Sequence, residues 1–280
     1  MQQHGSECKF TSSESWVILT PIEQSIKRKI EAVGTPLKDW DIQINYGIKT
    51  GFNPAFIIDE KTRSEILTNC KDEDERNRTD ALIRPILRGR DIKRYSYEWP
   101  GLYIIATFPA KHLDIEDYPA VKTHLLSFGK ERLEQTGKEY VVNGEKIKAR
   151  KKTTNKWFET QDTIAYMDDF LKQKIVYPET TQGAYFAFDA EGVFIDKTCF
   201  MMITEFPKYL QSTLSSKLFE FAYKRIFSSV ELGGHAYQYN KHALIKLPVI
   251  LPKTDKVLSD EEICTIYNLS RDEKKAIGIR

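Results

Sequence analysis

Short strand patterns and short helix patterns follow one another along this chain without a regular order, and this mixture is what most limits the fold. Thr20, Pro21 and Glu23 suit an N-cap, a first helical position and a capping box, so a helix is predicted that ends at Gly34. Residues 42–48 alternate apolar and polar side chains, which is typical of a half-buried strand. Because strands and helices do not alternate strictly, the sequence predicts an α+β class with mixed sheets and packed helices.

Apolar runs bounded by turn residues indicate where the other elements lie. Strands are predicted at 56–58, 102–107, 174–177, 184–188, 193–195 and 199–203. Helices are predicted at 63–69, 79–87, 117–135, 162–171 and 207–227, the last broken near Ser215-Ser216, and after the capping box of Ser259 and Glu262. Residues 71–78 resemble a charged loop. Asn143-Gly144 is a two-residue turn signal and predicts a hairpin within 137–155.

Composition bounds the function only loosely. The 280 residues include 42 cations and 40 anions, so the net charge of +2 does not by itself indicate a nucleic-acid binder, but charge can still be segregated locally. Four cysteines, at positions 8, 70, 199 and 264, lack zinc spacing and are expected to be reduced thiols. No apolar run approaches the length of a membrane span, and the N-terminus is polar. We therefore expect a cytoplasmic protein without a membrane partner.

Three groups of cations point to a polyanion as ligand. The segment 87–95 presents four cations around Gly89, namely Arg88, Arg90, Lys93 and Arg94, and Lys217, Lys224 and Arg225 lie along the helix predicted at 207–227. A glycine-flanked turn at 47–51 adds Lys49 and Thr50. The run 146–156 has six cations and no acid, and includes Lys148, Arg150, Lys151 and Lys152. Like charges at this density repel one another unless a polyanion or counterions neutralise them. The alternative interpretation of each group is a solvated surface.

The sequence does not assemble an active site, and we predict no catalytic residue and no metal site in this chain. The segment Asn53-Pro54-Ala55-Phe56 approaches an adenine-methyltransferase motif but lacks the upstream glycine-rich nucleotide turn. Asp59-Glu60-Lys61 matches only the short half of a metal-dependent nuclease motif. Two alternatives to DNA binding stay open, a stand-alone metal-dependent nuclease and a protein-interaction module that docks on a methyltransferase.

The chain also resembles one protein family in a series of ordered blocks. The blocks are residues 47–51, 55–59, 83–92, 94–95, 118–119, 124–125, 157–159, 174–179, 198–200, 209–210, 214–218, 233–234 and 247–248. They resemble the TaqI-like C-terminal specificity domain, the target-recognition domain of single-chain Type IIG restriction–modification enzymes and N6-adenine DNA methyltransferases. The resemblance runs from about Trp40 to Pro252. It implies a recognition domain at 40–252, a helical lead-in at 1–39 and a helical tail at 253–280.

This resemblance implies a reader of double-stranded DNA that has no chemistry of its own. The methyltransferase domain, which would act in cis or in trans, is missing from this chain, as is any nuclease. S-adenosylmethionine, and Mg²⁺ if a nuclease is present, are then cofactors of the parent enzyme and not of this chain. The residues expected to contact DNA are Lys49, Thr50, Arg88, Arg90, Lys93, Arg94, Lys148, Arg150, Lys151, Lys152 and, from a loop expected to reach base edges, Gly234, His235, Tyr237 and Lys241.

Overall fold

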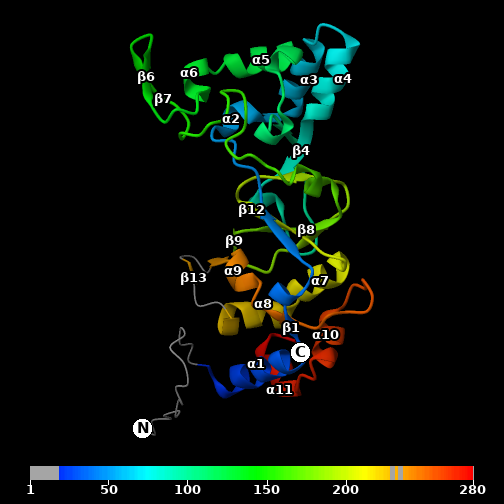
Figure 1. The fold of residues 1–280 in the computed structure, drawn as a ribbon. Helices are drawn as coiled ribbons and strands as arrows, with labels where there is room; N and C mark the ends of the chain where they lie inside the picture. The colour runs from blue at the N-terminus through cyan, green and yellow to red at the C-terminus, as the bar shows by residue number, and fades with distance from the viewer. Residues whose placement is uncertain (1–18, 228–230, 233–235, 280) are drawn as a thin grey trace.

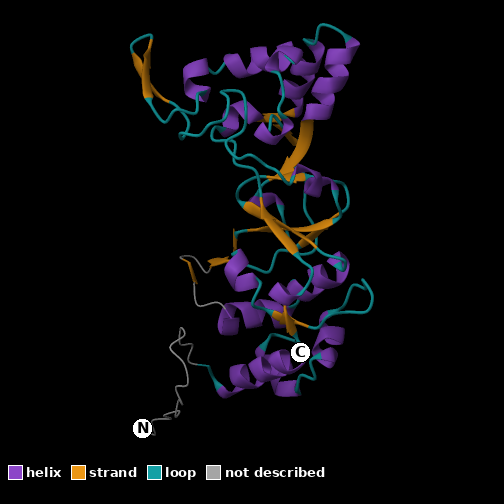
Figure 2. Ribbon diagram, viewed as in Figure 1, coloured by secondary structure: helices purple, strands orange, loops and turns teal. Residues whose placement is uncertain are grey.

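A central four-stranded sheet forms the middle of the molecule, with helices gathered at both ends (Figures 1 and 2). The computed structural model describes residues 19–227, 231–232 and 236–279. The central sheet has the order β10-β8-β12-β2 and is antiparallel throughout. Its strands are β2 (Gln43–Tyr46), β8 (Lys174–Pro178), β10 (Ala187–Asp189) and β12 (Cys199–Ile203). These strands confirm four of the predicted ones and the α+β class.

Both faces of the central sheet are buried, and each face belongs to a different hydrophobic core. Val176 and Met201 point into an upper core, whereas their neighbours Ile175 and Met202 point into a lower core. Successive side chains of a strand alternate between the two faces of a sheet, so one strand supplies both cores. The upper core lies beneath the helices at the top of Figure 1, and the lower core joins the sheet to the helices at the bottom.

A second sheet supports the upper half, with the order β11-β4-β5-β3. Its strands are β3 (Ile57–Asp59), β4 (Ile83–Leu87), β5 (Leu102–Ile105) and β11 (Phe194–Ile195), with β11 parallel to β4. The predicted helix at 79–87 is confirmed for residues 79–82 and wrong for 83–87, since α4 (Glu73–Leu82) ends where β4 begins. The loop expected at 71–78 is also wrong, because Asp72 caps α4 by accepting the N–H of Glu75 at 2.8 Å.

The upper helices are α2 (Asn53–Phe56), α3 (Glu60–Thr68), α5 (Pro119–Leu126) and α6 (Lys130–Leu133). The predicted helix at 117–135 is divided at Ser127–Gly129, where Gly129 has a φ of +84°. Beyond α6, β6 (Glu139–Val142) and β7 (Glu145–Lys148) form the predicted hairpin, which projects from the body at the upper left of Figure 1. Asn143 and Gly144 make its turn with φ values of +52° and +85°, which confirms the turn signal.

The lower half brings the two terminal segments together. Here α1 (Pro21–Val33) begins with the predicted capping box, and β1 (Thr35–Pro36) pairs with β15 (Pro248–Val249). The predicted break near Ser215-Ser216 separates α7 (Pro207–Leu214) from α8 (Lys217–Ala222), which continues into a π-helical turn at Tyr223–Phe227. The remaining elements are β9 (Thr180–Thr181), β13 (Glu231–Leu232), β14 (Ala236–Gln238), α9 (Lys241–Leu244), α10 (Asp260–Ile266) and α11 (Arg271–Ala276).

The two segments that flank the expected recognition domain both contribute to the lower core. Ile26 and Ile30 of α1 are fully buried there, together with Val249 of β15 and Cys264 of α10. The domain boundaries at residues 39 and 252 stay predictions. Both flanking segments pack in one core with residues from the centre of the chain. The helix expected at 162–171 is reduced to a 3-10 helix at Met167–Leu171. Within the described ranges, no helix is both long and apolar enough to cross a bilayer.

Candidate nucleic-acid interface

A cleft of about 960 Å³ lies where the two sheets meet the segment that follows β4. Three stretches of chain form most of its walls, the Arg88–Lys93 segment, residues 178–182 and residues 196–198, and Asn53 of α2 adds a fourth contact. Three of the four cations predicted to form a group at 87–95, Arg88, Arg90 and Lys93, thus line a cavity. The residues that line it are Asn53, Arg88, Gly89, Arg90, Ile92, Lys93, Pro178, Glu179, Thr180, Thr181, Gln182, Tyr185, Asp196, Lys197 and Thr198.

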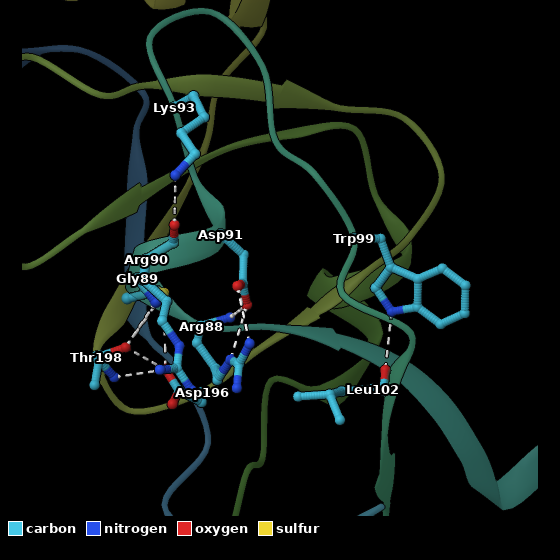
Figure 3. Close-up of polar contacts among 10 residues, drawn as sticks. Arg88, Gly89, Arg90, Asp91, Lys93, Trp99, Leu102, Asp196 and Thr198 are labelled. Carbon is cyan, nitrogen blue, oxygen red and sulfur yellow. Dashed lines mark hydrogen bonds and ion pairs between the residues drawn. The ribbon is translucent and has the colours of Figure 1, made fainter. Parts of the chain in front are cut away.

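A 3-10 turn at Gly89–Asp91 forms one wall, and an internal ion pair fixes its shape (Figure 3). The Arg88 guanidinium donates from Nε and Nη2 to the two carboxylate oxygens of Asp91, at 3.0 Å each, and the Arg88 N–H donates to Oδ2 at 2.8 Å. This hydrogen bonding raises the pKa of Arg88. Since Asp91 compensates its charge, Arg88 holds the turn in place, and its guanidinium is committed inside the protein.

The opposite wall holds the same turn from the other side. Thr198 Oγ1 accepts the N–H of Gly89 at 2.8 Å, and Asp196 in turn accepts from the Thr198 hydroxyl and, at 2.9 Å, from the Thr198 N–H (Figure 3). A Cβ at position 89 would lie 3.2 Å from Pro178 and from Thr198, so glycine permits this close approach. The turn is therefore fixed by contacts on two sides before any ligand arrives.

The fixed turn leaves three cations facing solvent at the cleft. Arg90, Lys93 and Lys197 are all exposed. Lys93 donates to the carbonyl of Arg90 at 2.9 Å, while the side chains of Arg90 and Lys197 have no hydrogen-bond or ion-pair partner among the described residues. Uncompensated cations on a rigid frame suit a polyanion, because the backbone that carries them need not be ordered when the ligand binds.

Arg150 corrects one prediction. Its side chain is only 4% exposed and donates to four backbone carbonyls, those of Thr50, Leu133, Trp157 and Glu159, at 2.6–2.8 Å. Burial lowers its pKa to about 10, so the guanidinium stays protonated at neutral pH. The expectation that Arg150 binds a phosphate is wrong, because its donors are already used to tie four segments together. By contrast Lys148, Lys151 and Lys152 are exposed, as expected of phosphate contacts.

Thr50 and Arg94 are also committed within the protein. Thr50 is 1% exposed, and its hydroxyl donates to Asn53 Oδ1 at 2.6 Å. It therefore orders the turn, and the expectation that it contacts DNA is wrong. Lys49, on the same turn, is half-buried. Arg94 forms an ion pair with Glu220 of α8, away from the cleft lining.

The expected loop at 233–241 is placed only in part. Lys241 donates to the Ile44 carbonyl of edge strand β2 at 3.1 Å, and Tyr237 lies beneath the ammonium of Lys224 at 4.9 Å. Gly234 and His235 fall outside the described residues. The remaining wall, Asp196-Lys197-Thr198, was missed by sequence reasoning. A polar triplet between two buried strands was the signal that could have indicated it.

The residues of the two catalytic motifs have structural roles. Asp59 caps α3 by accepting the N–H of Thr62 at 2.8 Å, and this hydrogen bond lowers the pKa of Asp59. Asn53 begins α2 and accepts the Thr50 hydroxyl. Across the part of the chain that the structure describes, no three His, Cys, Asp or Glu side chains are grouped so that they could hold a metal ion.

Comparison with known proteins gives a family and several similar solved structures, among them a Type IIL and a type IIG enzyme. The TaqI-like C-terminal specificity domain matches residues 84–249, more than half of the chain. The Type IIL restriction-modification enzyme MmeI, solved in complex with DNA, is similar with 13% identity and a TM-score of 0.47, over 75% of this chain and 25% of that one. The type IIG restriction endonuclease BpuSI is similar with 12% identity and a TM-score of 0.47, over 89% of this chain and 28% of that one. This chain thus spans about a quarter of each enzyme's length, and by the family match it belongs to the TaqI-like C-terminal specificity domains.

Proposed function

We propose that this chain reads a specific sequence on double-stranded DNA and presents it to an N6-adenine methyltransferase domain, in cis or in trans. The observation that carries the proposal is the cleft wall with Arg90, Lys93 and Lys197, three exposed cations on a frame fixed by Arg88–Asp91 and by Thr198. Membership in a specificity-domain family supports the same function. S-adenosylmethionine would bind the catalytic domain.

The three cations contact phosphates and so position the duplex, whereas base edges are read by other side chains. Phosphate contacts carry no sequence information, but they fix the register in which readers meet the bases. Arg88 is a positioning residue in this scheme, since it acts through the shape of the turn that presents Arg90. Glu179 also lines the cleft, and a carboxylate there disfavours phosphate and suits an exposed amino group of a base.

The test is selection of duplexes from a randomised pool by the full 280-residue chain, at about 50 mM and 200 mM salt, a range over which phosphate contacts weaken strongly. We expect one enriched motif whose affinity falls steeply with salt. The Arg90→Ala, Lys93→Ala, Lys197→Ala triple variant should bind all duplexes more weakly, and the salt slope should fall by about 2–3, since each lost phosphate contact removes about 0.9. An unchanged slope would contradict the assignment of these cations.

The matched control replaces three exposed cations outside the cleft lining, Arg28, Lys253 and Arg271, by alanine. It should keep the motif, the affinity and the slope. Absence of DNA binding at both salt concentrations would reject the proposal and favour a protein-docking module. Mg²⁺-dependent cleavage of the duplex by the purified chain would favour the nuclease alternative.

A further inference from the structure

The β6–β7 hairpin has one face without a protein partner. Its register pairs Glu139 with Lys148 and Val141 with Lys146, so these four side chains share a face, and all four are exposed. Val141 is 72% exposed, the largest value among the exposed large hydrophobic residues of the described chain. The other face, with Tyr140, Val142 and Ile147, is half-buried.

The charge around this face selects the kind of partner. Five exposed lysines lie within residues 138–152, at positions 138, 146, 148, 151 and 152, against two glutamates, Glu139 and Glu145. A two-stranded hairpin alone in water is marginally stable, so a ribbon that keeps an apolar side chain at its exposed face gains from a partner. The lysines favour a polyanion as that partner.

The base of the ribbon is linked to the cleft lining by a chain of hydrogen bonds. Arg150 is the second residue after β7. Its N–H donates to the Glu134 carbonyl and its carbonyl accepts the Gly137 N–H, at 2.9 Å each. Its guanidinium donates to the Thr50 carbonyl at 2.7 Å, and Thr50 bonds to Asn53, which lines the cleft. The ribbon and the cleft thus share one rigid support, so a duplex held at the cleft has a defined position relative to the ribbon.

We propose, on the basis of the proposed function, that the β6–β7 ribbon enters the major groove of the bound duplex with the face of Val141, Lys146 and Lys148 toward the DNA. Paired strands lie about 5 Å apart before side chains are counted, which fits a major groove about 12 Å wide and not a minor groove about 6 Å wide. Four residues of strand span about 13 Å, enough to cross a groove about 8.5 Å deep.

The chemistry of this face divides between base edges and backbone. Val141 is the apolar group that suits a thymine methyl, and Lys146, its cross-strand partner, suits the O6 and N7 acceptors of guanine. Lys148, nearer the root, meets a phosphate. The ribbon is therefore a specificity-determining element, whereas Arg90, Lys93 and Lys197 hold the backbone independently of sequence.

The first experiment measures affinity and base preference of the full chain on the motif obtained by selection. Lys146→Glu with Lys148→Glu should weaken binding at least about tenfold at low salt, because two attractions become repulsions. A control with the same charge change, Lys253→Glu with Arg271→Glu, should change affinity less than about twofold, since both residues are exposed and outside the cleft lining. Val141→Ser should relax the preference at one or two base pairs and leave the salt slope unchanged.

A second experiment locates the ribbon on the DNA. A DNA-cleaving iron chelate attached to Val141→Cys should cut within a few base pairs at fixed positions inside the selected motif, and the unsubstituted chain treated in the same way controls for Cys8, Cys70, Cys199 and Cys264. Scattered cutting, or none, would reject the groove assignment. If the cleft triple variant weakens binding but the ribbon variants match their control, the ribbon proposal fails and the proposed function stands. If the unsubstituted chain binds no duplex, the proposed function itself fails.

Discussion

Arg90 and Arg150 carry the same guanidinium in opposite surroundings. Arg90 is exposed at the cleft, whereas Arg150 is 4% exposed and donates to four carbonyls. Both belong to cation clusters in the sequence, and nothing within either cluster distinguishes a ligand contact from an internal tie. The difference arises from segments far away in the chain, because the carbonyl of Thr50 lies 100 residues before Arg150. Burial, which decides the role, is a property of the fold.

We predict that Arg150→Met destabilises the protein by about 3 kcal/mol, because several buried carbonyls lose a charged donor. Urea unfolding followed by circular dichroism gives the free energy of unfolding. The matched control, Arg90→Met, removes an exposed guanidinium and should change stability by less than about 0.5 kcal/mol. Equal stability of the two variants would show that the four carbonyl contacts do not hold the fold.

Gly47 allows a second prediction at this scale. A Cβ at position 47 would lie 2.0 Å from the Asp196 carbonyl oxygen, a backbone atom that cannot turn away. Gly47→Ala should therefore cost about 1–3 kcal/mol and weaken DNA binding as well, since Asp196 supports the cleft wall. Gly89→Ala, with its nearest contacts at 3.2 Å, should cost less. A Gly47→Ala variant as stable as the native chain would contradict the close packing.

At the scale of elements, the C-terminal helix is attached to the N-terminal one by an ion pair. Lys29 of α1 donates to Glu273 of α11 at 2.6 Å, and the Glu273 side chain is 5% exposed. Burial alone would raise the pKa of Glu273, but the hydrogen bonds from Lys29 and from the Ser270 N–H lower it to about 2. The ordinary pKa of this group is 4.5. The stability that Glu273 contributes is therefore present above about pH 4.5 and lost as the pH falls toward 2.

We predict that Glu273→Gln costs about 2 kcal/mol at pH 7, and that its difference from the native chain shrinks as the pH falls from 4.5 to 2. Urea unfolding at several pH values within this interval measures the effect. Glu261→Gln removes an exposed partner of Lys274 and should have little effect at any of these pH values. A Glu273→Gln difference that stays constant with pH would show that packing, and not the ion pair, attaches α11.

Local signals predicted the elements they determine. The capping boxes at Thr20 and Ser259, the Asn143-Gly144 turn and the break at Ser215-Ser216 all depend on residues within a few positions, and all are confirmed. The helix predicted at 79–87 is wrong beyond Leu82, because pairing of β4 with β5 outweighs a helical pattern there. The candidate site, too, was predictable only where it depends on residues close together in the sequence. The sequence indicated the segment at 88–93. The wall at 196–198 lies beside it because β11 pairs with β4, and this pairing joins residues about 100 positions apart.

On the scale of the whole molecule, two cores share one sheet, and the described residues near each end of the chain belong to the lower core. Removing residues 1–39 deletes Ile26, Ile30 and Leu37 from that core and leaves β15 unpaired. We predict that this truncation lowers the free energy of unfolding by several kcal/mol, since each large buried side chain contributes about 1.5–3 kcal/mol. As a control, a variant with Gly-Gly in place of residues 140–147, which removes most of the β6–β7 ribbon, should keep native stability. A truncated chain with an unchanged urea midpoint would contradict a shared core.

Because the β6–β7 ribbon projects from the body, its sequence could change over generations with little effect on the fold. Its exposed face contributes to neither core, so replacing Val141, Lys146 or Lys148 opens no cavity and orphans no buried polar group. The root at Arg150 would keep presenting whatever side chains the ribbon carries. A lineage could therefore drift through many ribbon sequences, and so through many targets, while selection on folding acts elsewhere in the chain.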